Sequence, residues 1–180
     1  MPWTADSLYA YLRHGHSREH GAATGPMAPV VQELAALPDA DIRAMALYLS
    51  SFQAPDAPVR PVATRTDVLP GPAQRLFENA CGACHHDGDG PRLLGLNLPL
   101  ALSTKLHSDR PDNLLRVMLE GVREAAGPQV GFMPGFADNL SDAQIALLSG
   151  YLRQRYAPDK PAWPHLASRV AELRVAPAPH

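Results

Sequence analysis

Apolar residues recur at intervals of three and four in several separate stretches of the chain, which is the spacing of amphipathic helices. Two helices are expected in the first 52 residues, one around Leu8–Leu12 and one from Leu37 to about Phe52. Further helices are expected after Pro72, Pro111 and Ser141. The pattern therefore predicts an all-α protein.

The helices of the second half have recognisable starts. Pro70-Gly71-Pro72 opens a helix whose apolar face carries Ala73, Leu76, Phe77 and Ala80. Residues 141–144 read as a capping box for the last helix, which runs to Tyr156 and buries Ile145, Leu148 and Leu152. The first and last helices must cross to close a domain this small, so Phe77 is expected near Leu148 and Tyr151.

The two halves of the chain share a pattern. Gly15 to Met27 and Gly121 to Met133 span the same 12 residues. Four residues also match at a constant offset of 103: Asp39 with Asp142, Ile42 with Ile145, Tyr48 with Tyr151, and Leu49 with Leu152. Two tandem copies are indicated. The first copy would consist of two helices and a methionine loop. It would lack the helix and the cysteine motif that come before these elements in the second copy.

One motif of the second copy, Cys81-Gly82-Ala83-Cys84-His85, carries its chemistry. Two thiols three positions apart with a histidine after the second is the spacing of a c-type haem, in which both cysteines bond the porphyrin and the histidine binds the iron. Cys81 and Cys84 are the only cysteines, so haem attachment would leave none for a disulfide. The motif predicts one covalent haem c, with His85 as an iron ligand.

Three other interpretations of the motif compete with haem. A zinc site needs four ligands, and the sequence has no second Cys-x-x-Cys or His-x-x-x-His nearby. A thioredoxin-like dithiol expects a βαβ surrounding, whereas these flanks are helical and rich in proline and glycine. Chance spacing is the third, and the sequence that follows argues against it.

Met133 is the expected second iron ligand, because it lies in a Gly/Pro-rich loop just before a new helix. Met118 instead sits among apolar residues of a helix and is expected in the core. His107 is the main alternative ligand. His86 cannot reach the opposite face of the haem from its place beside His85. An apolar loop at residues 93–106 is expected to wall the haem.

Composition narrows the setting. The chain has 180 residues, 46% of them hydrophobic, and a net charge of −2, which gives no case for nucleic acid binding. Its 19 prolines cluster in residues 53–72 and 157–180, which read as linker and tail. The tail carries a short amphipathic turn, which is expected either to fold back on its own domain or to dock a partner or a membrane surface. The start lacks a secretory leader and no membrane span is seen, although haem c is attached outside the bacterial inner membrane. The sequence therefore predicts the C-terminal piece of a longer exported protein.

On these residues the chain resembles class I cytochromes c over about 70–156, through Cys81–His85, Asp112-Asn113-Leu114, Gly121 and Met133-Pro134. It is similar more narrowly to the multihaem cytochrome c subunits of bacterial membrane-associated alcohol, aldehyde, gluconate and N-heterocycle dehydrogenases. The resemblance implies residues 1–52 as the back half of an upstream haem domain, a linker at 53–70, a class I cytochrome c fold at 71–156 and a tail at 157–180. Met27 then matches the ligand methionine of the upstream haem.

The resemblance implies an electron-transfer subunit and not an enzyme. It would relay single electrons at the periplasmic face of the inner membrane, from a catalytic dehydrogenase subunit towards quinone or a terminal oxidase. Two alternatives stay open. One is a free-standing small periplasmic shuttle. The other is a haem enzyme or gas sensor with an open sixth site, for which Arg92 and His107 are available.

Overall fold

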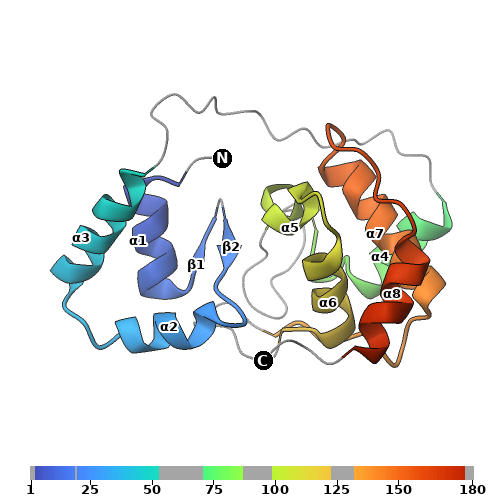
Figure 1. Cartoon of the computed structure of the whole chain (residues 1–180), viewed down its shortest axis with the longest axis horizontal. Helices are drawn as coiled ribbons and strands as arrows, with labels where there is room; N and C mark the ends of the chain where they lie inside the picture. Colours follow the sequence, from blue (N-terminus) through green and yellow to red (C-terminus); the bar gives the residue numbers. More distant parts are fainter. Residues whose placement is uncertain (1–2, 19, 53–70, 87–98, 123–131, 177–180) are drawn as a thin grey trace.

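The computed structural model describes residues 3–18, 20–52, 71–86, 99–122 and 132–176, and its helices fall into two groups (Figure 1). The fold is mostly helical, as the hydrophobic pattern predicts. The N-terminal group holds α1 (Ala5–His14), β1 (His16–Ser17), β2 (Gly21–Ala22), α2 (Met27–Leu34) and α3 (Asp39–Ser50). The C-terminal group holds α4 (Pro72–Ala80), the 3-10 turn η1 (Leu100–Leu102), α5 (Thr104–His107), α6 (Asp112–Glu120), α7 (Asp142–Tyr156) and α8 (Leu166–Val175).

The C-terminal group is built around one core. Leu115, Ile145 and Leu148 are fully buried in it, and Phe77 from α4 packs on Tyr151 from α7 with ring centroids 5.7 Å apart. The predicted crossing of the first and last helices is therefore confirmed. The capping box is also confirmed. The Ser141 hydroxyl accepts from the Gln144 N–H at 3.3 Å, and the Gln144 side chain accepts from the Ser141 N–H at 2.9 Å.

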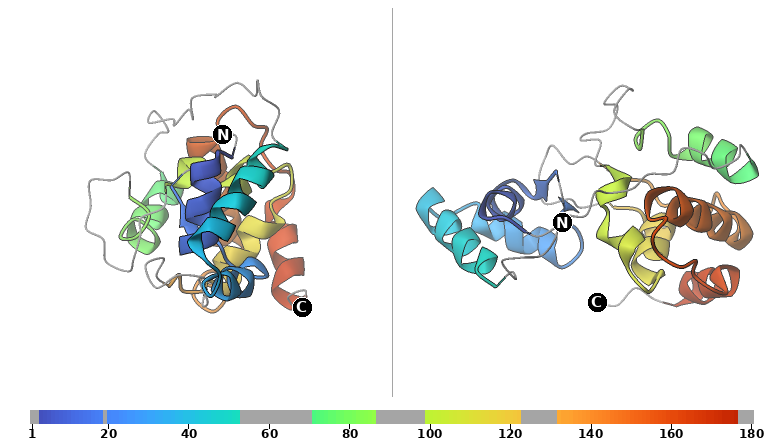
Figure 2. Two further views of the ribbon diagram at one scale, coloured as in Figure 1. Left: turned by 90° about the vertical axis from the view of Figure 1, so that its left-hand side faces the viewer. Right: turned by 90° about the horizontal axis from the view of Figure 1, so that it is seen from above.

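In the N-terminal group α1 packs along α3 (Figure 2), and in the C-terminal group α6 contacts both α7 and α8. Gly15 follows α1 and Gly121 follows α6, and both have φ of 76°, but ψ is 10° at Gly15 and −168° at Gly121. The two groups differ in how far their last matching helices, α7 and α3, are covered by other helices. Tyr151 on α7 is 5% exposed beneath α4, whereas its repeat partner Tyr48 on α3 is 65% exposed. The described residues thus leave open the face of α3 that corresponds to the covered face of α7.

The region of Met27 differs from the expected two helices and a loop. Met27 opens an additional helix, α2, so the N-terminal group has three helices within the described residues. Gly25 at φ 57° turns the chain, and its carbonyl accepts the Ala28 N–H at 3.0 Å. Pro29 falls in the first turn, where a missing N–H costs the helix nothing. The hydrophobic pattern predicts no helix here, and prolines at positions 26 and 29 argue against one in general.

Residues 99–106, expected as loop, contain η1 and most of α5, and Leu106 is fully buried. The rest of the expected haem wall, residues 93–98, lies outside the described residues, as do Arg92 and the linker at 53–70.

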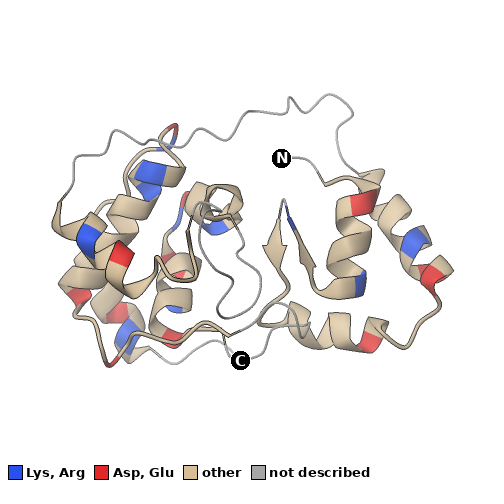
Figure 3. Cartoon of the chain, turned by 180° about the vertical axis from the view of Figure 1, so that it is seen from behind, with Lys and Arg blue, Asp and Glu red and all other residues tan. Residues whose placement is uncertain are grey.

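The tail folds back on its own domain, which decides between the two expectations for it. Helix α8 packs on α6 and α7, and Trp163, Val170 and Leu173 are buried in the same core as Phe77. Lys and Arg positions are interspersed with Asp and Glu positions along the helices of both groups (Figure 3). Among the described helices, none has the length and apolarity needed to span a membrane.

Candidate haem site

The Cys81–His85 motif forms a compact turn at the end of α4. The Cys81 and Gly82 N–H groups both donate to the Phe77 carbonyl at 2.8 Å. The Cys84 and His85 N–H groups donate in turn to the Cys81 carbonyl, at 3.1 and 2.9 Å. A side chain at position 82 would place its Cβ 2.8 Å from the Glu78 carbonyl oxygen, so this turn requires glycine. The structure thus places Cys81, Cys84 and His85 within one turn of the backbone.

The thiols and the imidazole suit covalent haem. Cys81 and Cys84 are half-buried and neither is in a disulfide, and Cys81 packs against the hydrophobic core. Burial, with a smaller contribution from Cys84, raises the pKa of the Cys81 thiol to about 11, so it is protonated at neutral pH. Burial and the neighbouring His86 lower the pKa of His85, which favours the neutral imidazole that binds metals.

The imidazole of His85 also has an unsatisfied polar atom. Its Nδ1 is buried without a hydrogen-bond partner in the described part of the chain. A buried polar group in this state is costly unless another group, such as a bound cofactor, completes its environment. The residues present therefore fit a haem c bound through Cys81, Cys84 and His85.

The loop that carries Met133 is fixed to the C-terminal end of α6. Val122 and Met133 form an antiparallel bridge, with N–H to carbonyl distances of 2.8 and 3.1 Å. Further along, the Phe136 N–H donates to the Met118 carbonyl at 2.9 Å and the Ala137 N–H to the Leu119 carbonyl at 3.1 Å. Met133 itself is half-buried. Because Met118 and Leu119 belong to the core against which Cys81 packs, both predicted ligand segments rest on one scaffold.

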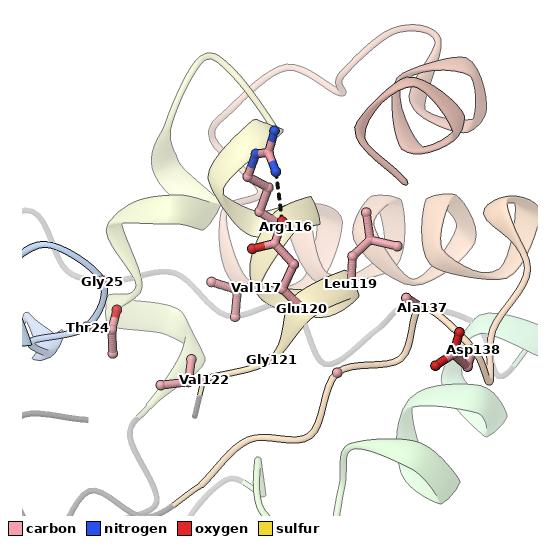
Figure 4. A pocket seen from close by; sticks show the side chains of 11 residues that line it. Thr24, Gly25, Arg116, Val117, Leu119, Glu120, Gly121, Val122, Ala137 and Asp138 are labelled. Atoms are coloured by element: carbon pink, nitrogen blue, oxygen red, sulfur yellow. Dashed lines mark hydrogen bonds and ion pairs between the residues drawn. The ribbon is translucent and has the colours of Figure 1, made fainter. Parts of the chain in front are cut away.

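Two glycines, Gly121 and Gly135, let this loop approach α6 closely; Figure 4 shows Gly121 at the end of α6. A Cβ at Gly121 would lie 2.4 Å from the Met133 carbonyl oxygen and 2.5 Å from the Gly135 nitrogen. A Cβ at Gly135 would lie 2.6 Å from the Leu119 carbonyl oxygen. Sequence reasoning used Gly121 as a marker of the repeat and missed the role of Gly135. Its place directly after Met133-Pro134 was the available signal.

The other candidate ligands have different surroundings. Met118 is 4% exposed, and its sulfur accepts from the Ser149 hydroxyl at 3.4 Å, so the expected core role is confirmed. His107 uses Nε2 to bond the Ala101 carbonyl at 2.8 Å, which ties α5 to η1. Met27 lies half-buried at the start of α2, in the other group of helices.

Two further observations bear on the alternatives. No group of three His, Cys, Asp or Glu side chains suited to a metal ion occurs among the described residues, so the zinc interpretation gains no support there. A cavity of about 820 Å³ lies between the Thr24–Gly25 turn and the end of α6, where Arg116 and Glu120 form an ion pair (Figure 4). Cys81, Cys84 and His85 do not line it, so this cavity is separate from the motif.

Comparison with known proteins places these features in a family. Residues 70–152 match the family described as cytochrome C oxidase, cbb3-type, subunit III. The chain is 50% identical to one subunit of the nicotinate dehydrogenase of Pseudomonas putida, over 99% of its own length and 15% of that protein. It is 33% identical to the gluconate 2-dehydrogenase cytochrome c subunit of Pantoea cypripedii, over 84% of its length and 37% of the relative. It is 29% identical to the fructose dehydrogenase cytochrome subunit of Gluconobacter japonicus, over 86% of its own length and 37% of the relative. The chain thus spans well under half of each relative.

Proposed function

Because residues 70–152 of this chain belong to the cytochrome c family, we propose that Cys81 and Cys84 attach one haem c and that His85 and Met133 ligate its iron. The fit of the Cys81–His85 turn to the cofactor is the main support, together with the unsatisfied Nδ1 of His85. Two of the relatives are named as cytochrome subunits, and this domain is an electron-transfer domain and not a catalytic one.

When bound, haem c carries one electron by changing between Fe(II) and Fe(III). The chain's own residues set the conditions for that change. The two thiols hold the cofactor against loss, and the neutral His85 imidazole supplies a nitrogen ligand. The Met133 thioether is a soft ligand of the kind that raises the potential of cytochromes c. If His85 and Met133 both ligate the iron, the protein supplies its remaining ligands, and no substrate would need to reach the metal.

For the wider role, we propose a relay that takes electrons from a catalytic dehydrogenase subunit and passes them to a quinone or cytochrome acceptor in the periplasm. The names of the relatives support a dehydrogenase partner, since nicotinate, gluconate and fructose dehydrogenases all appear among them. The long alignments over 84% or more of this chain favour such a subunit over a free-standing shuttle.

Replacing Met133 tests the ligand assignment. In the haem-loaded chain, Met133→Ala should abolish the sulfur–iron charge-transfer band at the red end of the ferric spectrum, because the thioether is its source. Carbon monoxide should then bind the ferrous protein rapidly. Met118→Leu is the control, since a volume-conserving core change should leave the band intact. A band that survives in Met133→Ala would show that the ligand is another residue. Rapid carbon monoxide binding by the parent protein would instead support an open sixth site.

We also propose that residues 1–52 are the back half of a second cytochrome c domain, with Met27 in the position of its ligand methionine. The 12-residue spacing from Gly15 to Met27 and from Gly121 to Met133 supports this proposal, as does the place of the two glycines directly after α1 and α6. In a complete domain, a helix equivalent to α4 would cover Tyr48 as α4 covers Tyr151.

The open face of α3 can be checked with matched substitutions. Tyr151→Ser should lower the free energy of unfolding by about 3 kcal/mol, because it removes a well-packed aromatic side chain from the core. Tyr48→Ser, at the corresponding position, should cost less than about 1 kcal/mol, because that ring is 65% exposed. Urea denaturation followed by circular dichroism gives both values. Equal losses would mean that the Tyr48 face is covered in solution.

A further inference from the structure

The segment after α7 is an integral layer of the C-terminal group. We call residues 157–176 the C-terminal strap; it includes α8 and lies beyond residue 152, where the family match ends. Val170 is fully buried against the core, and Trp163 and Leu173 are 7% and 6% exposed. Burial of this kind holds the strap in place without a partner.

One end of the strap bonds the segment that joins the Met133 loop to α7. The Arg174 guanidinium donates to the Ala137 carbonyl, to the Leu140 carbonyl at 2.8 Å and to the Asp142 carboxylate at 2.7 Å. The same short segment is bonded to α6 from its other side, since the Ala137 N–H donates to the Leu119 carbonyl. Residues 137–140 are therefore held between α6 and the strap, four residues after Met133.

A second arginine of α8, Arg169, fixes α6 itself. Arg169 forms two hydrogen bonds to the Asp112 carboxylate, at 2.8 and 3.0 Å, at the first residue of α6. These two hydrogen bonds lower the pKa of Asp112, so the pair is charged at neutral pH. The far end of α6 is where Val122 pairs with Met133. The strap thus connects the start of the α6 scaffold to the end of the loop that α6 carries.

We propose that the C-terminal strap is a positioning element for Met133, and that Arg174 acts as its latch on the Met133 loop. This inference rests on the proposed ligation of iron by Met133. Without Arg174, the Ala137 and Leu140 carbonyls lose a charged donor and the loop keeps only its bonds to α6. The loop should then open more often, and an external ligand should displace Met133 from the iron more easily.

The test is a titration of the ferric, haem-loaded 180-residue chain with imidazole. Binding is monitored by the loss of the charge-transfer band. Arg174→Gln should raise the apparent affinity for imidazole about tenfold or more, as expected for losing charged hydrogen bonds of this strength. Asp142→Asn keeps the Arg174 side chain and both carbonyl bonds, so it should change the affinity less than about threefold. Arg174→Lys keeps a cation but loses the fork that reaches three acceptors, and should not restore the parent value.

Arg169→Gln is the matched control within the strap. It removes a charged pair of similar geometry at the other end of α6, so it should lower thermal stability as Arg174→Gln does, with little change in imidazole affinity. An unchanged affinity in Arg174→Gln would overturn the latch, and so would an equal rise in both variants. A parent protein that lacks a band dependent on Met133 would instead refute the proposed ligation.

Discussion

Replacing Gly121 by alanine should displace the Met133 loop and lower the free energy of unfolding of the C-terminal group by about 3 kcal/mol. Gly121 has φ of 76°, so any side chain there is strained. The added Cβ would also meet backbone atoms of the loop, at 2.4 Å from the Met133 oxygen and 2.7 Å from the Pro134 carbonyl carbon. Since these atoms cannot rotate away as a side chain would, the loop itself must move.

Gly21→Ala separates the two causes. Gly21 has a similar φ of 81°, but a Cβ there meets nothing within 4 Å, so only the backbone strain of about 1 kcal/mol applies. Urea denaturation followed by circular dichroism gives both losses, and the Soret band reports on the C-terminal group when haem is bound. The charge-transfer band should weaken in Gly121→Ala alone. Equal losses in the two variants would show that the close approach of the loop to α6 is not maintained in solution.

Much of the C-terminal group could be predicted from local pattern. The capping box at Ser141 and the apolar face around Phe77 each depend on residues close in sequence, so spacing alone located α7 and α4. The Cys81–His85 motif could also be recognised from the sequence, because its residues all lie within one turn of the chain. Met118 was assigned to the core from its apolar neighbours, and the structure places it there.

The features that pattern did not reveal depend on contacts between distant residues. The place of Gly135 directly after Met133-Pro134 does not tell which part of α6 the loop meets. No local pattern marks Arg174 as a donor to carbonyls 34 and 37 residues away. Pattern could not place the strap, because an amphipathic turn fits its own core and a partner equally well. Helix α2 was missed because its prolines, which argue against helix in general, fall where the helix tolerates them.

Arg153 is the clearest example of such a hidden role, and its replacement by methionine should cost about 3 kcal/mol of unfolding free energy. Its side chain is buried, with 2% exposure, in a helix position where sequence alone suggests a solvated charge. It donates to the Leu106 carbonyl, to Ser108 at 3.0 Å and to Pro161 at 3.1 Å, and lies 4.2 Å over the Trp163 ring. Methionine fills the space but leaves these buried carbonyls without that donor.

Arg43→Met is the control, because Arg43 also stacks on an aromatic ring, at 4.0 Å over Tyr9, and pairs with Asp39. Its side chain is 59% exposed, so water can replace the lost bonds and the cost should stay below about 1 kcal/mol. Urea denaturation of both variants measures the difference. Since Leu106 and Ser108 lead from α5 to α6, Arg153→Met should also loosen this connection, seen as faster amide hydrogen exchange there. A loss in Arg153→Met no larger than in Arg43→Met would mean that the strap does not bury this arginine in solution.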